Sequence, residues 1–76
     1  MFHYVIAKNV DRKAFDSACA LIEAKIEGVR KEKLLEDVDG TLIQIYHTAS
    51  GKIKVFDDYE VDAVYVDSDL KLDHIF

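Results

Sequence analysis

The stretch that decides the fold is Thr41-Leu-Ile-Gln-Ile-Tyr-His-Thr-Ala-Ser-Gly-Lys-Ile-Lys-Val-Phe56. Most of its first eight residues are β-branched or aromatic, which is typical of a strand. Residues 52–56 follow with a Lys-Ile-Lys-Val alternation, the period-two pattern of a second strand. Ser50-Gly51 lies between the two segments and is a turn signal. The stretch therefore predicts two consecutive strands that pair as an antiparallel hairpin.

Further strands are predicted on both sides of this hairpin. Before it, Asp39-Gly40 is a strong two-residue turn signal, because a type I′ turn needs positive φ at both positions. Residues 33–38 form the strand that leads into this turn. After the hairpin, Asp57-Asp58 indicates a third turn, and residues 59–66 form a strand whose core-facing side chains are Tyr59, Val61, Ala63 and Tyr65.

A strand and one helix precede these elements. Residues 2–7 are rich in β-branched and aromatic side chains and predict the first strand. Asn9 or Asp11 then offers the N-cap oxygen of a helix, and Gly28 suits its C-terminal end. Between them the apolar residues recur at helical spacing, at Phe15, Ala18, Cys19, Ile22 and Ile26. The alternative is a longer helix that passes through Gly28 into the basic residues 30–33.

These elements predict one α+β domain over residues 1–76, in the order β-α-β-β-β-β. One amphipathic helix packs on a four- or five-stranded, mostly antiparallel sheet, which is the simplest two-layer arrangement. The first strand lies either beside the last strand or inside the sheet. Residues 70–76 fit either a further strand or a turn of helix.

The predicted sheet is apolar on both faces. Two-residue loops at Asp39-Gly40 and Ser50-Gly51 place one set of side chains on one face, namely Leu35, Leu42, Tyr46, Ile53 and Val55. The other face then carries Leu34, Ile43, Ile45 and Phe56. One helix is about 10 Å wide and covers about two strands, so the second face needs the C-terminal segment or a partner to cover it. The alternative is a longer hairpin loop, which shifts the register and restores a polar face.

Composition limits the cellular setting and the partners. The chain has one cysteine, and its first residues lack the pattern of a signal peptide, which favours a reducing, cytoplasmic location. Its net charge of −5 argues against direct binding to nucleic acid or to an anionic membrane, because both need a basic surface.

Motifs of catalysis, cofactor binding and metal binding are absent from the sequence. Cys19 lies on the apolar stripe of the helix, where buried thiols are inert. His3, His47 and His74 are scattered, with no spacing typical of a metal site. Asp37-x-Asp39-Gly40 resembles the opening of a calcium loop but lacks the remaining ligands. We therefore expect no catalytic residue, no cofactor and no metal.

The excess negative charge lies in the last quarter of the chain. Residues 57–73 hold seven acids and one base, whereas the other 59 residues hold eight acids and nine bases. Asp58, Glu60 and Asp62 alternate along one face of the predicted strand, about 6.6 Å apart. This spacing gives about half the charge density of a DNA strand, which has a phosphate every ~3.4 Å. The alternative is that these acids only protect a sheet edge from pairing and aid solubility.

The leading hypothesis is a small acidic, non-enzymatic module that occludes a basic, nucleic-acid-handling surface of a larger protein. Toxin-immunity proteins and phage-encoded inhibitors of defence nucleases, such as anti-CRISPR proteins, are analogous in size and charge only. The expected partner-binding residues are Asp57, Asp58, Tyr59, Glu60, Asp62, Asp67 and Asp69. The second hypothesis is a homodimer that uses the apolar second face of the sheet. The third is a small-ligand domain or an enzyme.

Overall fold

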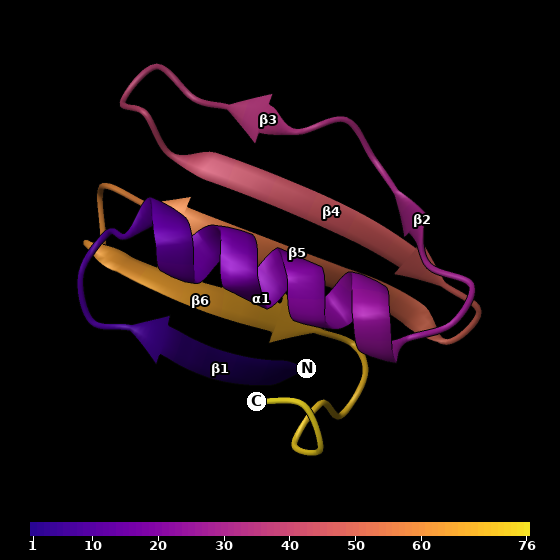
Figure 1. Ribbon diagram of the computed structural model, residues 1–76. Coiled ribbons are helices and arrows are strands. Elements are labelled where there is room, and N and C mark those ends of the chain that lie inside the picture. Colours follow the sequence, from indigo (N-terminus) through magenta and orange to yellow (C-terminus); the bar gives the residue numbers. More distant parts are fainter.

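The computed structural model describes all 76 residues and has two layers, one helix on a six-stranded sheet (Figure 1). In chain order the elements are β1 (Phe2–Ala7), α1 (Arg12–Lys25), β2 (Arg30–Lys31), β3 (Leu35–Glu36), β4 (Leu42–Thr48), β5 (Gly51–Asp58) and β6 (Ala63–Ser68). The strand order is β1-β6-β5-β4-β2, and β3 also pairs with β4. Every pair is antiparallel. The predicted α+β class is confirmed, and the first strand lies beside the last one.

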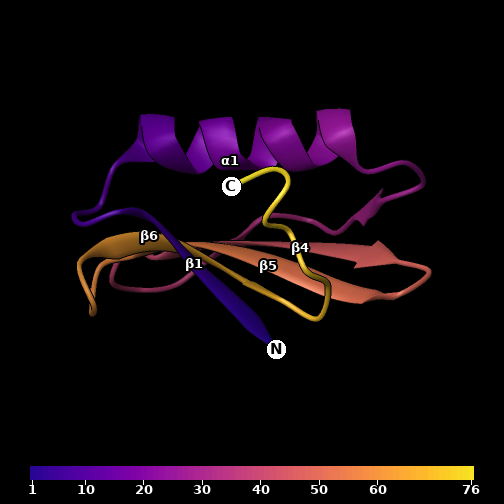
Figure 2. The same cartoon turned by 90° about the horizontal axis from the view of Figure 1, so that it is seen from below.

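Helix α1 begins and ends close to where the sequence predicts. The Asp11 side chain is the N-cap and accepts hydrogen bonds from the Lys13 and Ala14 amides, at 3.0 and 3.2 Å. The helix ends at Lys25, before Gly28, whose φ is +72°. The shorter of the two predicted helices is therefore present. Figure 2 shows α1 lying along one face of the sheet. No helix of this chain is long and apolar enough to cross a membrane.

The core forms between α1 and the sheet face beneath it. Its buried apolar residues are Phe15, Ala18, Cys19, Ile22, Leu42, Tyr46, Ile53, Val55, Val64, Val66 and Leu72. The prediction that Leu42, Tyr46, Ile53 and Val55 share one face is confirmed, since they lie on this side of β4 and β5. The opposite side of the sheet, which we call the open face, carries Ile43, Ile45, Phe56 and Tyr65 among other residues.

The predicted strand over residues 59–66 is wrong in its first half. Residues 59–62 form a turn, and β6 begins only at Ala63. The Asp58 carboxylate accepts hydrogen bonds from the Glu60 and Val61 amides, and Asp62 has a φ of +60°, so the chain reverses there. The predicted core-facing side chains are consequently not in the core. Val64 and Val66 take their place, whereas Tyr65 lies on the open face.

Turn lengths explain the remaining differences. The predicted two-residue turn at Asp39-Gly40 is a five-residue loop, because Leu35 pairs with Ile43 and Glu36 with Leu42. This register differs by one residue from the predicted one, so Leu35 lies on the open face and Leu34 turns toward α1. The other predicted turn moves to residues 49–50, a shift of two that leaves the faces unchanged. Of the strand predicted over residues 33–38, only residues 35–36 form a strand (β3), and the short strand β2 lies before the predicted range.

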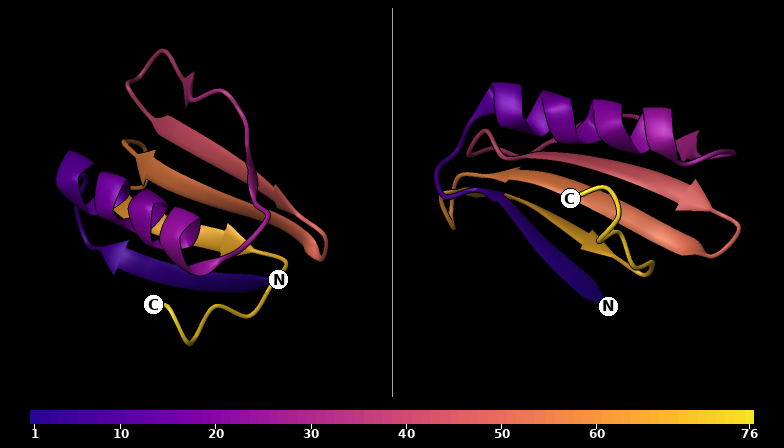
Figure 3. Two further views of the ribbon diagram at one scale, coloured as in Figure 1. Left: turned by 45° about the vertical axis from the view of Figure 1, so that its right-hand side comes forward. Right: turned by 60° about the horizontal axis from the view of Figure 1, so that its bottom comes forward.

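The C-terminal residues 70–76 pack on the helix side of the sheet. Leu72 is buried in the core, and its carbonyl accepts hydrogen bonds from the Ile75 and Phe76 amides, which makes a helical turn rather than a strand. The ring of Phe76 lies 5.9 Å from that of Tyr4 on β1. Figure 3 shows the segment turning back beside β1 and below α1. It therefore does not cover the open face.

Replacing Gly51 with alanine should destabilise the fold more than the same change at Gly28. Both residues have positive φ, +139° and +72°, but a methyl carbon at Gly51 would lie 2.6 Å from Asp69 Cβ. At Gly28 no atom lies within 4 Å. Urea denaturation should show a loss of about 2 kcal/mol or more for Gly51→Ala and about 1 kcal/mol for Gly28→Ala. Equal losses would contradict the close approach of β5 to Asp69.

Candidate functional site

Two turns that are distant in the sequence meet at one end of the sheet, on the left in Figure 1. The loop between β3 and β4 and the turn between β5 and β6 lie together there, because β4 begins where β5 ends. The Tyr59 amide donates to Thr41 Oγ1 at 3.0 Å. The Tyr59 ring lies against Gly40, where a Cβ would be 3.6 Å from the ring. We call residues 36–41 and 57–62 together the acidic end.

The acidic end holds almost half of the acids in the chain. Its seven carboxylates are Glu36, Asp37, Asp39, Asp57, Asp58, Glu60 and Asp62, and it contains no base. The remaining residues carry eight acids and ten bases. The negative charge therefore gathers at one end of the molecule, although its members come from two segments of the chain.

The structure brings together five of the seven predicted site residues, four of them accessible. Asp58, Tyr59, Glu60 and Asp62 lie in or beside one turn. Asp57 belongs to the same end but is only 2% exposed. Asp67 lies on the open face beside His3, and Asp69 lies near the opposite end, where its carboxylate accepts from the Lys52 amide at 2.9 Å. The predicted row of acids along one strand face does not exist, because residues 59–62 are a turn.

Two of these carboxylates fix the start of α1. Asp57 Oδ1 accepts a hydrogen bond from the Asp11 amide at 3.1 Å, beneath the helix N-cap. Asp62 accepts from the Val10 amide at 3.0 Å and from Asn9 Nδ2 at 3.1 Å. The Val10 bond, with a smaller contribution from Asn9, lowers the pKa of Asp62 below its usual value. These acids therefore hold the connection between β1 and α1 against the acidic end.

Asp58 holds the turn itself. Its carboxylate accepts the Tyr65 hydroxyl at 2.6 Å, in addition to the two turn amides. The Tyr65 hydrogen bond is the main reason why the pKa of Asp58 is lowered. Burial, together with the Asp58 charge, raises the pKa of Tyr65. Asp58 is thus a charged, fully engaged turn residue.

The groups at the acidic end that remain free for a partner are of two kinds. Glu36 and Glu60 are exposed and have no hydrogen-bond or ion-pair partner. Val38, Tyr59 and Val61 are exposed apolar or aromatic side chains, and Val38 is completely exposed. Glu36, Val38 and Val61 are not among the site residues predicted from the sequence. The run Glu36-Asp-Val-Asp39 beside a turn signal was the available clue.

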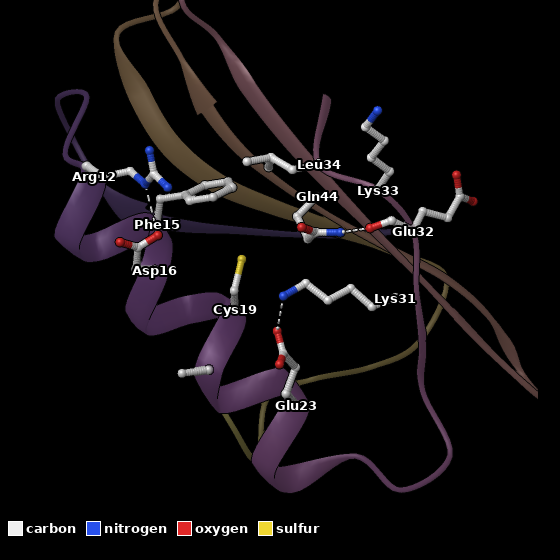
Figure 4. Close-up of a pocket in the computed structure, with 11 residues that line it drawn as sticks. Arg12, Phe15, Asp16, Cys19, Glu23, Lys31, Glu32, Lys33, Leu34 and Gln44 are labelled. Atoms are coloured by element: carbon white, nitrogen blue, oxygen red, sulfur yellow. Dashed lines mark hydrogen bonds and ion pairs between the residues drawn. The ribbon is translucent and has the colours of Figure 1, made fainter. Parts of the chain in front are cut away.

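A groove of about 440 Å³ lies between α1 and the segment that joins β2 to β3 (Figure 4). Its apolar lining is Phe15, Cys19, Ala20 and Leu34. Four of its charges are paired across short distances, with Arg12 3.0 Å from Asp16 and Lys31 3.2 Å from Glu23, whereas Lys33 has no ion-pair partner. The Tyr46 hydroxyl donates to Glu23 at 2.5 Å, and this bond, more than the one to Lys31, lowers the pKa of Glu23. Burial raises the pKa of Cys19, which keeps it a thiol.

The histidines are separate from one another and from the groove's thiol. His3 Nδ1 lies 2.6 Å from Asp67, and His47 contacts Glu32, which lowers the pKa of that carboxyl. His74 is exposed near the C-terminus. No group of three or more His, Cys, Asp or Glu side chains is placed to hold a metal ion.

Truncation of Asp57 should destabilise the fold, whereas truncation of Glu60 should hardly change its stability. Asp57→Ala removes a buried side chain and leaves the Asp11 amide without its acceptor, and should cost about 2 kcal/mol in the free energy of unfolding. Glu60→Ala removes an exposed side chain without a partner and should change it by less than about 0.5 kcal/mol. Urea denaturation of both variants checks the assignment. Similar stability of the two would show that Asp57 does not support the helix.

The free energy of unfolding should decrease at acid pH because of the hydrogen bonds to the Asp58 carboxylate. A lowered folded pKa stabilises the native state above the unfolded pKa of about 4, and this contribution is lost as the pH falls through the folded value. Tyr65→Phe removes the main cause and should raise the Asp58 pKa, which carboxyl NMR titration measures. Tyr59→Phe removes a hydroxyl without a partner and is the control. An unchanged Asp58 pKa in Tyr65→Phe would contradict the hydrogen bond.

Comparison with known proteins gives no relative for this chain. Searches against protein-family models, curated proteins and solved structures found no match. The function has to be argued from the geometry and chemistry of the acidic end.

Proposed function

We propose that this chain is a non-enzymatic protein-binding module that docks its acidic end on a basic surface of a larger protein. One observation carries the proposal. Two turns from different parts of the chain bring together seven carboxylates and no base, and they expose three apolar or aromatic side chains. This is the combination of a charged surround and apolar contact groups that recognition sites use.

The charge would act mainly on the rate and specificity of association. A patch of one sign speeds encounter with a patch of the opposite sign and disfavours partners of like charge. Glu36 and Glu60, which have no partner within the chain, are available for ion pairs. Tyr59 is half exposed and rigidly held by Gly40 and Thr41, which suits an aromatic anchor.

The hydrogen bonds within the acidic end also support the proposal, because they order its two turns. Asp58 and Asp62 fix the turn, and Asp39 accepts from the Thr41 amide at 2.9 Å in the neighbouring loop. A surface that is already ordered loses less conformational entropy on binding. The acids that hold backbone amides therefore preorganise those that are free.

The basic surface is most simply one that has evolved for nucleic acid. The acids lie on two turns rather than along a strand, so the module would cap a basic patch rather than imitate a row of phosphates. Immunity proteins and phage-encoded nuclease inhibitors remain an analogy of size and charge. Against an enzyme, the perturbed carboxylates Glu23, Glu32, Asp58 and Asp62 all have lowered pKa values. A general acid needs a raised one.

Reversing one free charge should weaken partner binding. Immobilised wild-type chain and the Glu60→Lys variant are exposed to lysate of the native host at low salt and at roughly 0.5 M salt. Retained proteins are identified by mass spectrometry, and the affinity of the partner is then measured with the purified protein. Glu60→Lys should weaken it about tenfold or more, because a like charge now faces the basic surface.

Two further variants make this test specific. Glu27→Lys makes the same charge change beyond the C-terminal end of α1, away from the acidic end, and should leave the affinity unchanged. Val61→Ser keeps the charge and should also weaken binding. A partner that is retained equally by all variants and at both salt levels would contradict the proposal.

A further inference from the structure

The open face is organised in rows that run across the strands. One row is entirely apolar and crosses the sheet from edge to edge, through Val5, Tyr65, Phe56, Ile43 and Leu35. Each member lies directly opposite the next in the strand pairing. The rings of Phe56 and Tyr65 are stacked, with centroids 4.7 Å apart. Five strand positions about 4.8 Å apart make this row about 19 Å long.

The row is exposed to solvent. Val5 and Leu35, at its two ends, are 58% and 49% exposed, and the three residues between them are only partly buried. Neither α1 nor residues 70–76 reach it, because both lie on the other side of the sheet. A continuous apolar strip of this length on a small protein marks an interface.

The charges of the open face differ on the two sides of this row. Toward one end of the strands come Asp58 and then the turn of the acidic end. Toward the other end, two rows away, come Lys52, His47 and Arg30, which are paired across β5, β4 and β2. The row between holds Lys54 opposite Asp67. Glu32 contacts His47, and the Asp69 carboxylate accepts from the Lys52 amide at 2.9 Å, so these acids moderate the positive charge. Along the strands the face therefore runs from acidic through apolar to basic.

We propose that a second copy of this chain covers the open face, related by a two-fold axis that runs along the apolar row. An axis perpendicular to the strands stacks the apolar row on its own copy. It also places the acidic end of each copy over Arg30 and Lys52 of the other. A two-fold axis parallel to the strands would instead set basic row against basic row and acid against acid. Charge complementarity therefore selects a self-complementary, antiparallel stack.

The size of the face explains why the charged rows matter. The face measures roughly 24 Å by 20 Å from strand spacing and residue rise. A stable interface of standard size buries about 800 Å² on each partner. The whole face has a flat area of only about 480 Å², so the dimer has to use the acidic and basic rows and their side chains as well as the apolar row. The proposal does not rest on the function proposed above, because its centre is the open face. It also uses the acidic end, so a second copy and a basic partner would compete for that end.

The dimer is tested by analytical ultracentrifugation of the purified chain over a concentration series. The wild type should dimerise, and Ile43→Asp should abolish the dimer by placing charges on the stacked row. Leu35→Asp, at an exposed edge position, is the second variant in case Ile43→Asp does not fold. A wild-type monomer at roughly 0.5 mM would overturn the proposal. So would a dimer that tolerates both substitutions.

The charge pattern has its own matched pair of variants. Arg30→Glu with Lys52→Glu makes the basic row acidic and should weaken the dimer about tenfold or more. Lys13→Glu with Lys25→Glu makes the same net change on α1, on the other side of the molecule, and should weaken it far less. Equal weakening would mean that only net charge matters and would count against the stack. These variants leave the acidic end intact, so partner binding and dimerisation can fail separately.

The orientation is tested by a spin label at Lys52→Cys in a Cys19→Ser background. Lys52 lies two rows from the apolar row, about 13 Å along the strand. In the antiparallel stack the two labels should be at least about 26 Å apart. An axis parallel to the strands would bring them to about 10 Å, the separation of stacked sheets. The short distance would overturn the proposed arrangement.

Discussion

One helix has to cover a sheet that is five strand positions wide. A helix is about 10 Å across and the sheet is about twice that, so α1 shields only part of one face. Leu72 and the residues after it fill the space beside α1 on that side. On the β2–β3 side a groove remains, in which charged residues pair with each other. The entire open face has no cover within the chain. The proposed dimer interface follows from this lack of cover.

The sequence predicts the central part of the fold well, because period-two alternation determines the faces of β4 and β5 regardless of an even shift in register. It fails where side chains decide the turns. The Asp58 carboxylate accepts hydrogen bonds from two backbone amides and forms a turn where the sequence predicts a strand. The five-residue loop before β4 places Leu35 on the open face, where Leu34 was predicted. The candidate site was half predicted, because acids 57–62 were visible as a run. Glu36 and Val38 lie beside these acids only because β4 pairs with both β5 and β3. Local sequence patterns do not predict this pairing of distant strands.

The carboxylates of the acidic end have different structural roles, which depend on their surroundings. Asp57 is buried and holds a helix, Asp58 and Asp62 hold backbone amides, and Glu60 is free in solvent. Counting carboxylates therefore overstates the charge that a partner could use. It understates the order of the surface, because every engaged carboxylate restrains a neighbouring loop. A small chain without disulfides or proline obtains rigid turns in this way.

The pairing of β1 with β6 also sets the order of events during synthesis. Phe2 lies opposite Ser68, so the first strand has no partner until residues 63–68 have been made. The start of α1 likewise waits for Asp57 and Asp62. On the ribosome, the apolar hairpin of β4 and β5 is therefore exposed before its neighbours can dock. We expect folding of this domain to be completed in one late, cooperative step, dominated by contacts between distant residues.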